Sequence, residues 1–207
     1  MMPVDPLVLL AFIPASLALN LTPGADMMFC LGQGLRHGPR AALAADAGIA
    51  LGGMVHVTVA GLGLGALMAA APWAFEAIRW LGVAYLLWLA YGALRAGPLD
   101  IEAPQHRAHA FRDALVVSLT NPKVILFVLA FIPQFVDPAR GPVLAQFLIF
   151  GAALSLGGLL INGAVGVLAG GAGRRLARSA KFARVLRYIS AGVFGALALR
   201  LAVMERA

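Results

Sequence analysis

The stretch Asn-Leu-Thr-Pro-Gly-Ala-Asp at residues 20–26 interrupts an apolar run that extends from about Pro6 to Leu35. Proline removes a backbone donor, and glycine loosens the chain at the same place. In hydrocarbon, irregular backbone persists only where it is buried in protein or lines a wet cavity. The stretch therefore predicts a broken helix at membrane depth, beside an internal cavity.

The composition of the chain is typical of a membrane protein. Of its 207 residues, 61% are hydrophobic and only 12% are charged, whereas roughly 25% are charged in an ordinary soluble domain. The net charge of +7 does not indicate nucleic-acid binding, because the basic residues cluster between long apolar runs. The single cysteine, Cys30, excludes an internal disulfide. The N-terminus has no basic region and no cleavage motif, so we interpret the first apolar stretch as a retained helix.

Six membrane spans are predicted, since about 20 apolar residues of helix cross a bilayer core. The fourth span contains Thr-Asn-Pro-Lys at residues 120–123 and is broken like the first. The fold expected is an all-α membrane protein. Its predicted spans are residues 6–35, 41–71, 75–94, 112–136, 142–169 and 188–203.

The spans divide into two similar halves. When Pro23 is placed beside Pro122, a Gly-Pro pair, a Gly-Gly pair and an Arg-aromatic pair recur in the same order in both halves. Each half has three spans, which is an odd number, so the second half must cross the membrane in the opposite sense. The sequence thus predicts two inverted three-helix repeats, residues 1–95 and 112–207, joined by a cytoplasmic linker at 96–111.

The charges predict the orientation. With both termini in the periplasm, the predicted inner loops carry eleven basic residues and the outer side carries four, in agreement with the positive-inside rule. The inner residues are Arg36, Arg40, Arg95, Arg107, Arg112, Arg174, Arg175, Arg178, Lys181, Arg184 and Arg187, and the outer ones are Arg79, Arg140, Arg200 and Arg206.

Both breaks also have the signature of a helix start. Thr22 is the predicted N-cap of the first, with Pro23 at the first helical position, and Asn121 is the predicted cap of the second, ahead of Pro122. Each half would then present a half-helix N-terminus deep in the membrane, which suits a carboxylate.

Charged groups stand beside both breaks. Asp26 is the predicted receptor for a substrate ammonium or a coupling proton, and Lys123 pairs with it or with a substrate carboxylate. Two other interpretations remain open: that Asp26 complements its helix dipole and that Lys123 snorkels to an interface. Asp46 is a further candidate, but its place about one turn inside the second span leaves a position near the interface open. His56 and Asn162 are midspan groups that serve either transport or helix packing.

These segments resemble the lysine exporter (LysE/RhtB) family of amino-acid efflux proteins. Residues 20–26 are similar to the family's N-x-T-P-G-P-D stretch, and residues 121–136 to its N-P-K…A-F-x-P-Q-F pattern. The chain departs from the family at Ala25, where a second proline is usual. The resemblance implies proton-driven export of amino acids or their derivatives across a bacterial inner membrane, without a cofactor. The site residues that it implies are Asn20, Thr22, Pro23, Gly24, Asp26, Asn121, Pro122 and Lys123.

Two other functions and the oligomeric state stay open at this point. Asp26, Asp46 and His56 could supply a metal-cation transporter on the same scaffold. An intramembrane enzyme would need a nucleophile with a partnered base, and neither Ser118 nor Ser155 has an evident one. The glycine-rich fifth span fits either a homodimer or packing within one chain.

Overall fold

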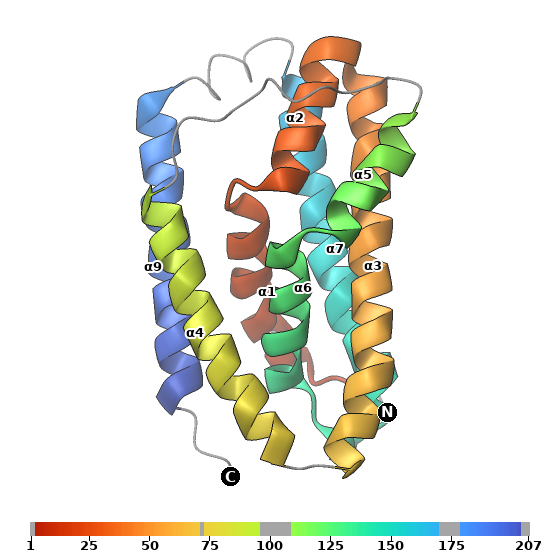
Figure 1. Ribbon diagram of the computed structural model, residues 1–207, viewed down its shortest axis with the longest axis vertical. Coiled ribbons are helices and arrows are strands. Elements are labelled where there is room, and N and C mark those ends of the chain that lie inside the picture. The colour runs from red at the N-terminus through yellow and green to blue at the C-terminus, as the bar shows by residue number, and fades with distance from the viewer. Residues whose placement is uncertain (1–2, 71–72, 96–108, 170–178, 204–207) are drawn as a thin grey trace.

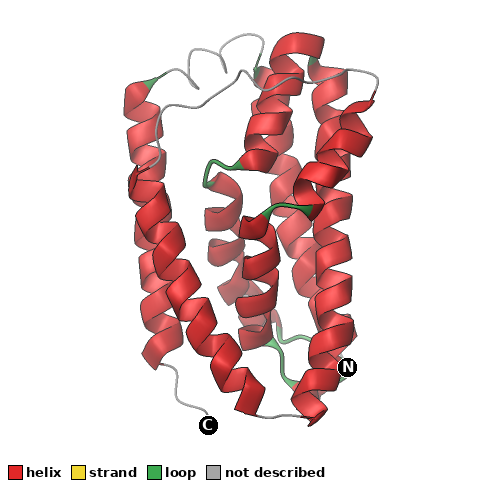
Figure 2. Cartoon of the chain, in the orientation of Figure 1, coloured by secondary structure: helices red, strands yellow, loops and turns green. Residues whose placement is uncertain are grey.

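In the computed structural model, which describes residues 3–70, 73–95, 109–169 and 179–203, every regular element is helical (Figures 1 and 2). The expected all-α class is confirmed for these residues. The expected linker at 96–111 lies largely outside them. The helices, with η for a 3₁₀ helix, are α1 (Pro6–Leu21), α2 (Ala25–His37), α3 (Pro39–Ala70), α4 (Trp73–Arg95), α5 (Ala110–Leu119), α6 (Pro122–Ala130), η2 (Ile132–Phe135), η3 (Pro138–Arg140), α7 (Val143–Leu168) and α9 (Ala180–Val203).

Three of the described helices have segments that are long and apolar enough to cross a membrane: Pro39–Leu64, Glu76–Arg95 and Val143–Leu168. Two bent pairs pass the same test, α1 with α2 at 55° and α5 with the segment Pro122–Phe135 at 52°. The chain is therefore a multi-pass membrane protein with up to five spans by these criteria. The sixth predicted span falls within α9, which begins at Ala180 rather than near Tyr188.

Glycines set the close approach of helices in the interior. α3 packs along α5 on one side and along α7 on the other, and α4 packs along α9 (Figure 1). A Cβ atom at Gly151 of α7 would lie 2.5 Å from Val57 of α3, and one at Gly52 would lie 2.7 Å from Ser118 of α5. These glycines serve helix packing within the chain, as predicted.

A cluster of phenylalanines fills the core between α1, α6, η2 and α7. Phe12 lies at its centre, with ring centroids 5.0 Å from Phe150, 5.3 Å from Phe135 and 6.2 Å from Phe131. By contrast, Leu7 and Leu160 are about three-quarters exposed. Large apolar side chains on the outside match a hydrocarbon solvent.

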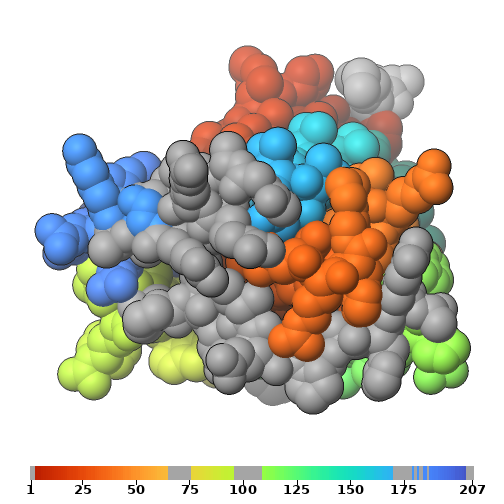
Figure 3. Space-filling model, turned by 90° about the horizontal axis from the view of Figure 1, so that it is seen from above, coloured from red at the N-terminus to blue at the C-terminus, as the bar shows by residue number. Residues whose placement is uncertain are grey.

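Each end of the bundle has a turn made by a glycine. α1 begins and α9 ends at the same end of the bundle (Figure 1). α2 turns into α3 at the opposite end, which Figure 3 views from above. Gly38 makes this turn at φ 86°, and Gly141, its partner in the repeat alignment, precedes α7 at φ 145°. Both backbones lie in a region that favours glycine.

Candidate functional site

The first break runs through Thr22, Pro23 and Gly24, and its observed caps differ from the predicted ones. Thr22 is the C-cap of α1 and not the N-cap of α2; its hydroxyl donates to the Ala18 carbonyl oxygen at 2.6 Å. Gly24 is the N-cap, and α2 begins at Ala25. The prediction was wrong because the Thr22 hydroxyl bonds the carbonyl four residues back and α2 begins only at Ala25, after two further non-helical residues.

The second break is shorter, and its cap is the predicted one. Asn121 is the N-cap of α6, and its side-chain oxygen accepts from the backbone N–H of Lys123 at 3.0 Å. Pro122 occupies the first helical position, where the missing donor is not needed. Tyr85 of α4 donates to the Lys123 carbonyl oxygen at 3.0 Å and so ties α6 to the neighbouring helix.

Each proline deprives the carbonyl four residues earlier of its helical donor, and a side chain from the other half compensates. Lys123 Nζ donates to the Leu19 carbonyl oxygen at 3.0 Å. His56 Nε2 lies 3.1 Å from the Ser118 carbonyl oxygen, and since a carbonyl only accepts, this nitrogen is the donor. The two carbonyls are equivalent in the repeat alignment. The two breaks are thus fastened across the halves, which the sequence did not reveal.

The Lys123 ammonium is held inside the protein by the carbonyl end of α1. It also donates to the Thr22 carbonyl oxygen at 2.8 Å, and it lies 3.1 Å from the place that a Gly24 Cβ atom would occupy. A helix C-terminus carries partial negative charge and stabilises a cation there. The ion pairs of the described residues do not include one between Lys123 and Asp26, so Lys123 neither snorkels outward nor pairs directly with that carboxylate.

A cavity of about 30 Å³ lies where the two breaks meet α3 and α7. Asp26 and Asp46 both line it and are 7% and 1% exposed, and one oxygen of each carboxylate is buried without a hydrogen-bond partner. A buried carboxylate oxygen of this kind calls for a ligand, a proton or a water molecule. Asp46 is therefore buried among the helices beside this cavity.

Two asparagines and two serines, Ser118 and Ser155, also line this cavity. Asn20 of α1 donates from Nδ2 to the Leu154 carbonyl oxygen at 3.0 Å, which ties α1 to α7. Asn162 of α7 is 4% exposed and lines the same space. Sequence reasoning named Asn162 without choosing between transport and packing, and its position on the cavity favours the former. The other predicted site residues are not among those that line the cavity: Thr22, Pro23, Gly24, Asn121, Pro122 and Lys123.

Two other reactive side chains lie away from this cavity. Cys30 is buried in helix packing, and His109 is exposed just before α5. Within the ranges that the structure describes, no group of three or more His, Cys, Asp or Glu side chains is arranged to hold a metal ion.

Comparisons with known proteins give consistent results. A family model described as LysE type translocator matches residues 17–205. The homoserine/homoserine lactone efflux protein of Salmonella typhimurium is 40% identical over 145 residues, 68% of this chain and 70% of that protein. The leucine efflux protein of Klebsiella pneumoniae is 35% identical over 147 residues, 68% of this chain and 69% of that protein. No solved structure matches significantly.

Proposed function

Because the chain belongs to the LysE family of translocators, we propose that it exports small amino acids or their derivatives from the cytoplasm. Members of this family are efflux transporters, so the enzyme and metal-transport alternatives are set aside. The relatives are named for homoserine, homoserine lactone and leucine. All three solutes carry an α-ammonium group, but the lactone has no free carboxylate. The ammonium is therefore the group that one site could recognise in all of them.

The observation that carries this proposal is the pair of buried carboxylates at the central cavity. Asp26 and Asp46 face one space from α2 and α3, each with an oxygen that lacks a hydrogen-bond partner. A charged group at membrane depth is costly and usually lines a transport path. The two carboxylates would bind the substrate ammonium, with Asn20 and Asn162 beside them as neutral hydrogen-bonding groups.

The first break would also bind the carboxylate of a free amino acid. The backbone N–H groups at the start of α2, around Gly24, form the positive end of a half-helix beside Asp26. These groups suit the carboxylate of a free amino acid. Lys123 and Asn121 would act by holding both breaks in place, since Lys123 already donates to two carbonyl oxygens of the first.

The cavity size implies a closed conformation. About 30 Å³ is enough for roughly one water molecule, but not for an amino acid. Export would then require α1–α2 and α5–α6 to move against α3 and α7, so that the cavity opens to one side at a time. Competition between a proton and the substrate ammonium for the same carboxylates would couple this movement to the proton gradient.

The finer architecture is part of the proposal. Six spans in two inverted repeats are supported by the reciprocal fastening of the breaks and by the pairing of α3 with α7 and α4 with α9, which are equivalent helices of the two halves. The positive-inside rule then places both termini in the periplasm. The glycines of α7 are engaged within the chain, at Gly151 and Gly158 among others, so they give no support to a homodimer.

Inverted membrane vesicles test the function. With a proton gradient, wild-type vesicles should accumulate labelled leucine, homoserine or homoserine lactone, and Asp26→Asn vesicles should not. Asp113→Asn is the matched control, because this carboxylate faces the surface beside Arg112. If well-inserted wild-type protein accumulates none of these solutes, the proposed substrate class is wrong. If Asp26→Asn transports like the wild type, the proposed site is wrong.

A further inference from the structure

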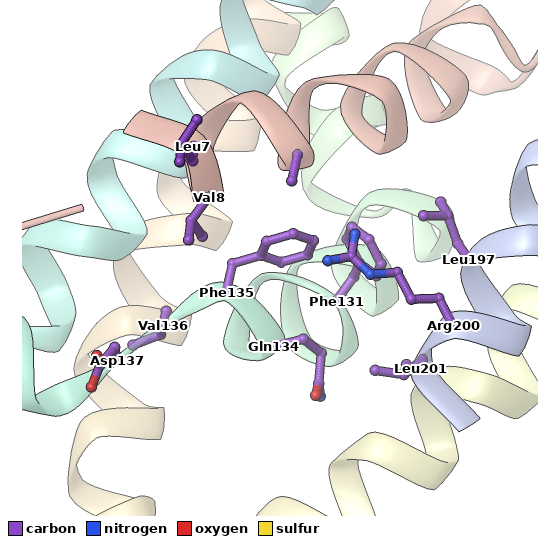
Figure 4. A pocket seen from close by; sticks show the side chains of 11 residues that line it. Leu7, Val8, Phe131, Gln134, Phe135, Val136, Asp137, Leu197, Arg200 and Leu201 are labelled. Atoms are coloured by element: carbon purple, nitrogen blue, oxygen red, sulfur yellow. The ribbon is translucent and has the colours of Figure 1, made fainter. Parts of the chain in front are cut away.

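A second, larger cavity lies at the end of the bundle where α1 begins and α9 ends (Figure 4). Its volume is about 460 Å³, within the range of roughly 300–1,000 Å³ that is usual for small-molecule sites. Side chains from α1, from η2 with its flanking residues and from α9 line it. It is large enough for an amino acid, which the central cavity is not.

The lining of this pocket is mostly apolar and has few polar groups. Leu7 and Val8 of α1 lie on one side and Leu197 and Leu201 of α9 on the opposite side (Figure 4). The Arg200 guanidinium extends from α9 over the Phe135 ring, 5.9 Å from its centroid. None of the ion pairs among the described residues includes Arg200. The planar guanidinium matches a carboxylate in geometry and charge.

Gln134 supplies a neutral acceptor in the same pocket. Its Nε2 donates to the Ala130 carbonyl oxygen at 3.3 Å, which leaves Oε1 to accept from a ligand. The other charged lining residue, Asp137, is paired with Arg140, whose Nε lies 3.6 Å from an Asp137 carboxylate oxygen. One cation, one amide oxygen and apolar side chains on both sides correspond to the carboxylate, ammonium and side chain of an apolar amino acid.

The phenylalanine cluster separates the pocket from the central cavity. Val124 of α6 lines the central cavity, and Phe135, which follows α6, lines the pocket. Between them along the chain, the Phe127 and Phe131 rings lie 4.8 Å apart, and the Phe131 and Phe135 rings 5.0 Å apart. Aromatic rings thus lie along the chain between the residues that line the two cavities.

We propose that the pocket beside Arg200 is a second, release-side site for the transported amino acid, in which Arg200 binds the substrate carboxylate. This inference rests on the proposed function and on the periplasmic orientation of the termini. A substrate leaving the central cavity would pass the phenylalanine cluster and be held here before release. Because homoserine lactone has no carboxylate, Arg200 would discriminate between free amino acids and the lactone on this side only.

Exchange measured at each face of the membrane tests the assignment. Right-side-out and inverted vesicles are loaded with unlabelled solute, and the external concentration for half-maximal exchange is determined for L-leucine and for L-homoserine lactone. For Arg200→Gln, the leucine value should rise about tenfold in right-side-out vesicles, the loss expected for a charge-assisted hydrogen bond. It should stay within about twofold in inverted vesicles, as should the lactone value on both faces.

Two variants control for loss of charge and loss of structure. Arg79→Gln removes another cation of the predicted outer side, one that is paired with Glu76 at 3.0 Å and does not line the pocket, and should leave leucine exchange unchanged. Arg200→Lys keeps the charge but not the planar fork, so it should show a smaller rise of about threefold for leucine alone. This comparison still decides the matter if Arg200→Gln fails to insert.

Other outcomes of these measurements would overturn the assignment of the pocket. Equal changes for leucine and the lactone, or none for either, would overturn the inference while the proposed function stands. A rise at the cytoplasmic face alone would overturn the release-side assignment. Loss of a co-purified phospholipid from Arg200→Gln with unchanged leucine exchange would make the pocket a lipid site. Wild-type vesicles that exchange neither solute would overturn the proposed function, and this inference with it.

Discussion

Each helix break leaves one carbonyl oxygen without its helical donor, and a different side chain replaces that donor at each break. At the first, Pro23 leaves the Leu19 carbonyl without its helical donor, and a buried ammonium, that of Lys123, compensates. At the second, Pro122 leaves the Ser118 carbonyl oxygen without its helical donor, and this oxygen accepts from the His56 ring and also from the backbone N–H of Asn121 at 3.1 Å. The first break depends on one charged side chain from the other half, whereas the second is supported twice.

This difference indicates which break is built to act. The second has a side-chain cap and restarts at once with Pro122, so its geometry is largely local. The first is extended at both Thr22 and Gly24 and has no side-chain cap on α2. The first N–H groups of α2 have no acceptor within the helix, and Asp26 in the same turn lines the cavity. We therefore expect the first break to bind the substrate and to change conformation during transport. We expect the second break to hold the first in place.

Lys123→Met should have the largest effect. It removes the donor to the Leu19 and Thr22 carbonyls and leaves both in the interior. Losing charge-assisted hydrogen bonds of this kind destabilises by roughly 2–3 kcal/mol, and transport should fall about thirtyfold or more. SDS-induced unfolding and vesicle uptake measure the two effects. Lys181→Met, at an exposed position of α9, is the control, and equal behaviour of the two variants would contradict the special role of the first break.

His56→Leu should be milder. The Ser118 carbonyl keeps the Asn121 N–H, and interhelical hydrogen bonds in membrane proteins are worth about 0.6 kcal/mol on average. We expect a loss of stability of about that size and transport within about fivefold of the wild type. The exposed His109→Leu serves as the control in the same assays. A loss as large as that of Lys123→Met would show that the breaks are equivalent.

Replacing each proline by alanine restores the missing backbone N–H group and should affect the two breaks differently. In Pro122→Ala the helix can become continuous if Asn121 alone turns helical, so the cost of His56→Leu should shrink by about 0.5 kcal/mol in this background. In Pro23→Ala, both Thr22 and Gly24 would have to change, so the cost of Lys123→Met should remain. Double-mutant cycles on unfolding free energies measure both couplings, and equal couplings would refute the asymmetry.

Gly24→Ala should have the smallest effect. Gly24 is extended at φ −163°, which any residue adopts, and the new Cβ would meet the flexible end of Lys123 at 3.1 Å. The ammonium needs to shift by only a few tenths of an ångström, so uptake should fall by less than about threefold. An abolished uptake would mean that the Lys123 position at this break tolerates no displacement.

Sequence reasoning reached the breaks because proline and glycine act locally. The Asn121 cap followed from the residues next to it, and the depth of Asp26 from the length of the apolar run around it. It failed at Thr22, whose hydroxyl can either accept from an N–H of the next helix or donate to the Ala18 carbonyl oxygen. Which of the two bonds forms depends on where α2 begins. It left the surroundings of Asp46 open because the sequence alone does not say which neighbouring helix the Asp46 face of α3 meets.

The sequence by itself determined that this chain belongs in a membrane, that it is all-helical and that two of its helices are broken, because hydropathy, span length and proline chemistry need no partner. Only the tertiary structure decided that Asp26 and Asp46 share one cavity, that Lys123 and His56 fasten the breaks across the two halves, and that Arg200 stands over a second pocket. These contacts join residues far apart in the chain, and their register is set by how glycine-lined helices pack against one another.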